Sequence, residues 1–156
     1  MKPYEIEAVA SEPSLHEFSM DDYLDAAALW RDTPGVGLSN SDQPGAIAAF
    51  LARNPGLSFV ARHGRALAGT VLCGHDGRRG HLYHVAVEPL YRRGGLARKL
   101  VQASLRALAD AGIVKCHLMV YAGNAPGQAF WRGIGADERM DLDLYSLAAP
   151  TPAGKS

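Results

Sequence analysis

The sequence predicts an α/β protein in which helices cover both faces of one twisted, mixed β-sheet. Two observations predict this fold class. Short strand-like segments, separated by glycine and proline, predominate in the first half of the chain. From His81 onwards, strand-like and helix-like patterns alternate as β-α-β-α-β. The 156 residues suffice for one domain with its own hydrophobic core.

The first half of the chain combines strands with two helices. Ser19 followed by Asp21 and Asp22 is typical of a helix N-cap, and Pro44 suits the first turn of a second helix. Glycine and proline separate the remaining patterns. The predicted elements are a strand at 15–18, helices at 20–31 and 44–53, and antiparallel strands at 57–62 and 66–74.

The stretch 81–101 organises the rest of the chain. Residues 81–87 predict a strand, which Pro89 ends, and leucines at helical spacing predict a helix over 95–110. Between them, Gly94 and Gly95 permit a sharp turn at the helix N-terminus, where unpaired N–H groups and the helix dipole favour an anion. Arginines and a lysine add positive charge around this turn. No G-K-[ST] follows this glycine turn, and the full motifs G-x-x-x-x-G-K-[ST] and G-x-G-x-x-G are absent from the sequence, which argues against a nucleotide triphosphatase or a Rossmann protein.

The last third of the chain predicts a strand at 114–121, parallel to 81–87 because a helix connects them. A short helix at 126–133 and a closing strand at 138–147 follow. We therefore expect one domain over 15–147, an N-terminal extension at 1–14 and a C-terminal tail at 148–156.

Composition points to a soluble cytoplasmic protein. We expect it to be a monomer or a homodimer. Sixteen basic and sixteen acidic residues give a net charge of zero, which argues against bulk binding to nucleic acid or a membrane. No signal peptide and no apolar run of membrane-spanning length is recognised. Cys73 and Cys116 are too few and too far apart for a disulfide framework.

Two segments resemble the GCN5-related N-acetyltransferase (GNAT) superfamily. The run Arg92-Arg93-Gly94-Gly95-Leu96-Ala97 resembles the family's pyrophosphate motif R/Q-x-x-G-x-G/A, and 124–135 resembles N-x-x-A-x-x-F-Y-x-x-x-G. The resemblance implies a sheet of six to seven strands with about four flanking helices. It also implies acetyl-CoA as acyl donor and direct transfer to an amine of a small molecule, a peptide or a protein. The cofactor-binding residues that it implies are Val85, Ala86, Val87, Arg92, Arg93, Gly94, Gly95, Leu96, Ala97, Arg98 and Asn124.

The same resemblance supplies candidates for the chemistry. His81 stands where several family members carry a catalytic Glu or His, and imidazole titrates near neutrality. Tyr83 shares a strand face with His81, whereas His84 lies on the opposite face unless a bulge changes the phase. Tyr121 is a candidate proton donor, because Trp131 occupies the position of the family's usual acid, tyrosine. Trp30 has two interpretations: part of the acceptor pocket, or part of the core.

Other readings remain open at this stage. Trp131, together with Met119 at a position where relatives carry a catalytic Glu, is compatible with a CoA-binding module that has lost catalysis. An acyltransferase for a longer acyl group is a second alternative. We expect no metal, because Cys73, His75, Asp76, His81 and His84 show no recognised ligand spacing. The sequence does not identify the acceptor amine.

Overall fold

The computed structural model describes residues 12–154. They form two compact units, one up to Asn124 and one from Ala125 onwards. The sheet and its three flanking helices belong to the first unit. Most of the expected N-terminal extension, residues 1–11, and the last two residues of the expected tail lie outside the described residues.

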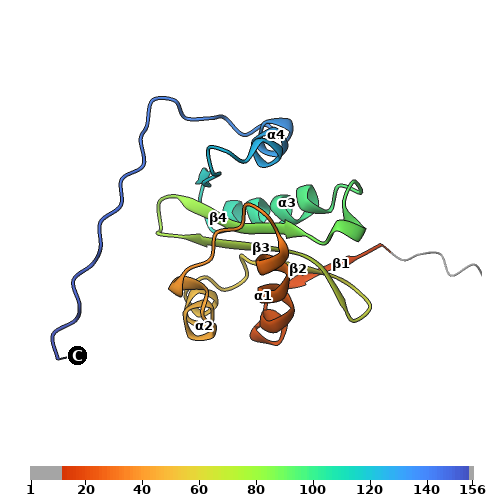
Figure 1. Ribbon diagram of the computed structural model, residues 1–156, viewed down its shortest axis with the longest axis horizontal. Helices are drawn as coiled ribbons and strands as arrows, with labels where there is room; N and C mark the ends of the chain where they lie inside the picture. Colours follow the sequence, from red (N-terminus) through yellow and green to blue (C-terminus); the bar gives the residue numbers. More distant parts are fainter. Residues whose placement is uncertain (1–11, 155–156) are drawn as a thin grey trace, which may run out of the picture. The chain divides into compact units, whose positions relative to one another are not determined.

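One sheet of five strands forms the centre of the first unit, in the order β1-β2-β3-β4-β5 (Figure 1). Neighbouring strands are antiparallel up to β4, and β5 is parallel to β4. The mixed sheet confirms the predicted fold class, and the parallel pairing confirms the expected crossover. The strands are β1 Ser14–Glu17, β2 Phe59–His63, β3 Ala66–His75, β4 Gly80–Val87 and β5 Cys116–His117.

The expected count of six to seven strands is wrong for the described residues. Of the strand expected at 114–121, only Cys116–His117 pairs with β4. Residues 138–147 form no strand and are exposed throughout. Their alternating apolar and acidic side chains favour an extended backbone, but a strand also needs a partner, and aspartate is a poor strand former. The sequence pattern of 138–147 therefore predicted an extended backbone, but it did not show whether a neighbouring strand would pair with it.

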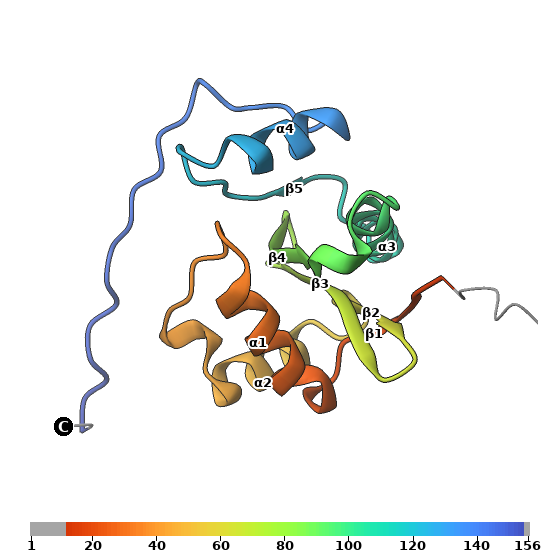
Figure 2. The same ribbon diagram turned by 45° about the vertical axis from the view of Figure 1, so that its right-hand side comes forward.

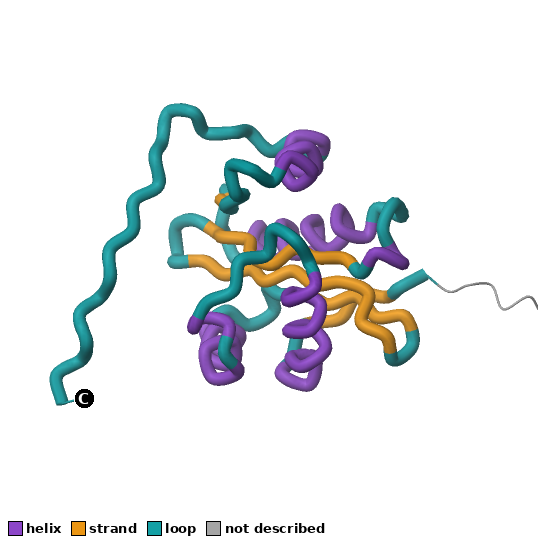
Figure 3. The backbone as a smooth tube through the Cα atoms, in the orientation of Figure 1, coloured by secondary structure: helices purple, strands orange, loops and turns teal. Residues whose placement is uncertain are grey.

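Helices cover both faces of the sheet (Figures 2 and 3). α1 (Tyr23–Asp32) and α2 (Pro44–Arg53) lie on one face, and α3 (Leu96–Asp110) lies on the other. α2 and α3 follow the predicted ranges closely, whereas α1 starts at Tyr23 because Met20–Asp22 form a separate 3-10 turn. α4 (Ala125–Gly133) forms the helical part of the second unit, also as predicted.

Close packing holds β4 from both sides. On the face of α3, a Cβ added to Gly80 would come within 2.6 Å of Leu108 Cδ1, so a larger residue there would displace the Leu108 side chain. On the opposite face, Ala86 joins a buried apolar cluster with α1, α2 and the neighbouring strands. That cluster contains Phe18, Ala26, Leu29, Trp30, Ile47, Val60, Leu67, Leu72 and Ala86. The strand that carries the candidate site is thus rigidly supported.

Candidate active site

A β-bulge interrupts β4 at His84. In the ladder with β3, Tyr83 pairs with Leu72 and Ala86 pairs with Thr70, so two residues of β4 oppose one residue of β3. His84 has φ +50°, an uncommon value for a residue with a side chain. The extra residue changes the phase of the strand. His84 therefore shares the α1/α2 face with Tyr83: its ring lies 4.7 Å from that of Trp30, and the Tyr83 ring lies 6.0 Å from that of Phe50.

The pairing of β4 with β5 ends before this bulge. Within residues 12–154, the parallel ladder contains only Gly80 with Cys116 and His81 with His117. A bulge bends its strand, which explains why the partner does not follow β4 further. Figure 2 shows β5 and its continuation running apart from β4. The main chain of β4 beyond His81 is consequently not part of a ladder on this side.

The glycine turn connects the end of β4 to the N-terminus of α3. Arg93 and Gly95 both have positive φ, +70° and +75°, and Gly95 is the N-cap of α3. A Cβ on Gly94 or Gly95 would meet nothing within 4 Å, so the outer side of the turn is open. Arg93 and Arg98 are exposed. The turn therefore combines unpaired helical N–H groups, exposed positive charge and free space, an arrangement that is suited to a phosphate.

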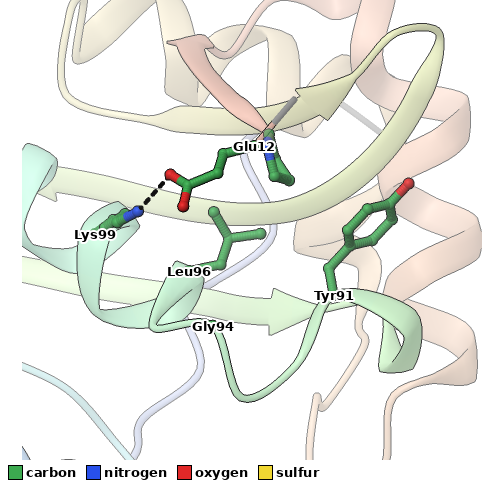
Figure 4. A pocket seen from close by; sticks show the side chains of 6 residues that line it. Glu12, Tyr91, Gly94, Leu96 and Lys99 are labelled. Carbon is green, nitrogen blue, oxygen red and sulfur yellow. Dashed lines mark hydrogen bonds and ion pairs between the residues drawn. The ribbon is translucent and has the colours of Figure 1, made fainter. Parts of the chain in front are cut away.

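A small hollow of about 100 Å³ adjoins this turn (Figure 4). It is lined by Glu12, Pro13, Tyr91, Gly94, Leu96 and Lys99. Its volume is below that of typical sites for small molecules, about 300–1,000 Å³, so it would accommodate only part of a ligand. Lys99 Nζ lies 3.3 Å from a carboxylate oxygen of Glu12, an exposed ion pair that an anionic ligand would have to displace or share.

A row of rings crosses the α1/α2 face beside the bulge. The ring centroids of His81 and Tyr83 are 6.3 Å apart, and those of His81 and His117 are 6.1 Å apart. Burial, and to a lesser degree the nearby Cys73, raises the pKa of the Tyr83 phenol. Tyr83 therefore keeps its proton at neutral pH and is suited to donate a hydrogen bond, not to act as a base.

The segment after β5 approaches the loop that follows α1. A Cβ added to Gly35 would lie 2.6 Å from Asn124 Nδ2, and one added to Gly37 would overlap the Tyr121 hydroxyl. Tyr121 is 62% exposed. Glycines at these two positions thus allow the α1 loop to pack against both candidate residues.

Trp30, by contrast, lies in the core. It is 1% exposed, and its indole Nε1 donates to Thr70 Oγ1 at 2.9 Å. It contacts the ring of His84 and lines no open surface.

Sequence analysis missed two residues that contact His84. Asp42 Oδ1 lies 2.6 Å from His84 Nε2, and Thr70 Oγ1 donates to the main-chain carbonyl of His84 at 2.8 Å. Asp42 is 42 positions from His84 along the chain, in the pattern S-N-S-D that is typical of a short capped turn. Only the bulge, which turns His84 toward this face, brings the two together. The one signal for these contacts in the sequence was the possibility that a bulge in the strand 81–87 turns His84 to the face of Tyr83.

Two further findings concern residues 12–154. No three His, Cys, Asp or Glu side chains are grouped as metal ligands would be. None of the helices in this part of the chain combines the length and apolar character needed to span a membrane.

Together, the bulged strand, the interrupted parallel pair and the glycine turn define an α/β protein with a candidate site for a phosphate-bearing ligand beside a main-chain edge. Residues 15–136 match the family model described as the acetyltransferase (GNAT) family. The chain belongs to this family, and the protein is an acyltransferase.

Relatives with curated names support this assignment. An acetyltransferase of Yersinia pestis (strain Antiqua) is 32% identical over 126 residues, covering 81% of this chain and 84% of the relative. An acetyltransferase of Pectobacterium atrosepticum is 33% identical over 107 residues, covering 69% and 75%.

Solved structures share the fold at low sequence identity. The PaiA N-acetyltransferase of Thermoplasma acidophilum, solved with coenzyme A, superposes with a TM-score of 0.73 at 16% identity, covering 85% of this chain and 94% of that one. Ard1 of Thermoplasma volcanium gives a TM-score of 0.70 at 17% identity, covering 80% and 82%. At these identities the likeness concerns the fold alone.

Proposed function

We propose that the protein transfers the acetyl group of acetyl-CoA directly to a primary amine of a small molecule, peptide or protein in a ternary complex. The observation that carries this proposal is the bulge of β4 at His84. It lies between the end of the parallel ladder and the glycine turn, so that one strand offers both a main-chain edge and a phosphate site. Acetyl-CoA has matching parts, namely pantetheine amides and a pyrophosphate.

Each part of the cofactor has a proposed partner. The main chain of Val85, Ala86 and Val87 would pair with pantetheine, as an additional strand would. The turn from Arg92 to Ala97 would hold the pyrophosphate on the N-terminus of α3, with Arg98 nearby. Asn124 would donate to the cofactor from the end of the β5 segment.

In the reaction, the amine loses a proton, a C–N bond forms and the C–S bond of the thioester breaks. The amine nitrogen attacks the thioester carbon, a main-chain N–H of the bulge binds the developing oxyanion, and the C–S bond breaks to release the thiolate. We assign the proton of the amine to His81, which stands where members of the family carry a catalytic Glu or His. The thiolate takes a proton from solvent or from Tyr83 or Tyr121; its pKa is near that of cysteine, about 8.5, so it leaves readily.

A panel of amines assayed for thiol release from acetyl-CoA tests the proposal. Release with at least one amine, together with an acetylated product of the expected mass, is the expected result. Binding of acetyl-CoA without release from any amine would instead indicate a non-catalytic CoA-binding module. Replacing acetyl-CoA by longer acyl-CoA donors in the same assay separates an acetyltransferase from an enzyme for longer chains.

A further inference from the structure

We propose that Thr70 and Asp42 are positioning residues that hold the β4 bulge in the geometry needed for acyl transfer. Both act on His84, Thr70 through its main chain and Asp42 through its side chain. The inference rests on the proposed function, because it assigns these residues to the main-chain group that would polarise the thioester.

The main-chain contact is fully buried. Thr70 is 0% exposed, and its hydroxyl has a single proton, which it donates to the carbonyl oxygen of His84. The same hydroxyl oxygen accepts from Trp30 Nε1 at 2.9 Å, which fixes the direction of that donation. A hydroxyl flanked in this way cannot rotate to another partner without leaving a buried polar group unsatisfied. The hydroxyl of Thr70 on β3 therefore fixes the orientation of the peptide group between His84 and Val85.

The side-chain contact is equally constrained. Asp42 and His84 each have side chains 14% exposed, and Asp42 Oδ1 lies 2.6 Å from His84 Nε2. The second carboxylate oxygen accepts from the main-chain N–H of Ser39 at 2.8 Å, and the Asp42 carbonyl accepts from the Tyr23 hydroxyl at 2.7 Å. Asp42 is thus fixed to its own loop and to α1 before it contacts His84.

Such support is needed because the bulge is strained. A left-handed conformation is unfavourable for a residue with a side chain, and His84 has φ +50°. An oxyanion donor works only when its N–H is about 2.7–3.1 Å from the developing charge. If His84 relaxed toward a regular strand, the amides of the bulge would rotate away from that position. Since the oxyanion exists only in the transition state, the loss should appear in kcat and not in binding of acetyl-CoA.

The decisive comparison is Thr70→Val against Thr70→Ser. Valine keeps the shape of threonine but removes both hydrogen bonds, whereas serine keeps the hydroxyl. We expect Thr70→Val to lower kcat roughly tenfold or more, as a misplaced oxyanion donor does, with the Kd for acetyl-CoA within about twofold of the parent. Thr70→Ser should restore most of kcat. Parent-like kcat in folded Thr70→Val, or an equal loss in Thr70→Ser, would overturn the proposal.

Ser104→Ala is the matched control for stability. Ser104 is also 0% exposed, and its hydroxyl donates to the Leu57 carbonyl at 2.7 Å, away from the bulge. We expect Ser104→Ala to lower Tm to a similar extent and to keep the parental kcat. If kcat falls equally in both variants below their Tm, Thr70 acts only through stability and the proposal fails.

Asp42→Ala tests the second contact and does not depend on a buried β3 substitution. It should lower kcat without changing the Kd for acetyl-CoA, while Asp22→Ala, which breaks another partly buried ion pair 2.7 Å long with Arg62, should not. Unchanged kcat in Asp42→Ala removes Asp42 from the proposal. Absence of thiol release by the parent protein with every amine and acyl donor would instead disprove the proposed function, a distinguishable result.

Discussion

Arg92 Nε donates a hydrogen bond of 2.9 Å to the main-chain carbonyl of Val87. This bond ties the glycine turn to the last residue of β4, so Arg92 shapes the turn as well as adding charge. Arg93, with φ +70°, and Arg98 in the first turn of α3 are exposed, as is Arg92, so the hydrogen bond and not exposure distinguishes Arg92. The three arginines that the sequence presents as equivalent phosphate ligands therefore differ in role.

Arg93→Ala should weaken CoA more than dephospho-CoA. We place the exposed Arg93 guanidinium at the 3′-phosphate, whose contact with an arginine is charge-assisted and sensitive to salt. Calorimetry with both ligands at two ionic strengths measures the difference. Equal losses for the two ligands would reassign Arg93 to the pyrophosphate or to solvent.

Arg92→Ala should weaken CoA and dephospho-CoA by the same factor, because it loosens the turn that holds the pyrophosphate common to both. It should also lower Tm, since a hydrogen bond from a charged donor to a main-chain carbonyl contributes about 1.5–3 kcal/mol when buried and less where it is solvated. A preference of Arg92→Ala for one ligand would contradict this shaping role.

Gly95→Glu should lower affinity for acetyl-CoA at least about tenfold, equivalent to about 1.4 kcal/mol. The substitution adds a negative charge beside the proposed pyrophosphate and a side chain at φ +75°. Gly112→Glu is the matched control, because Gly112 has φ +81° at the opposite end of the same helix. This variant should lose stability to a similar extent but keep the parental affinity for acetyl-CoA. Equal affinity in both variants by calorimetry would remove the glycine turn from the cofactor site.

Local patterns predicted the elements, but contacts between distant residues were not predictable. Leucine spacing and Pro44 located α3 and α2 almost to the residue, because helix formation depends on neighbours three or four positions away. Strand pairing depends on partners far along the chain, and this is why 114–121 and 138–147 were overpredicted. The bulge at His84 had no local signal, since neither glycine nor asparagine marks the residue with positive φ. The contacts of His84 with Asp42 and Thr70 depend on that bulge, and no local pattern predicted them.

His81→Ala should lower kcat/KM roughly 10²-fold and leave the Kd for acetyl-CoA unchanged, within the usual range for loss of a general base. His117→Ala removes the neighbouring ring on β5, 6.1 Å from His81, and serves as the control for packing. Steady-state rates with one acceptor amine, at one pH, compare the two. A small and equal loss in both variants would show that His81 is only a strand residue, and the base would then be sought elsewhere on this face.

Cys73 should make the folded state less stable at alkaline pH. Burial, followed by the nearby Cys116, raises the pKa of this 0% exposed thiol to about 12. In the unfolded chain the thiol ionises near pH 8.5, so the unfolded state binds fewer protons than the folded state above that pH. Stability is therefore fully retained below about pH 8.5 and falls as pH rises toward 12, by about 1.4 kcal/mol at pH 9.5. Urea unfolding of the parent and of Cys73→Ala at pH 7.5 and 9.5 isolates this contribution, because Lys and Tyr residues titrate in both proteins. The stability difference between parent and variant should shrink at the higher pH, and a constant difference would contradict the raised pKa.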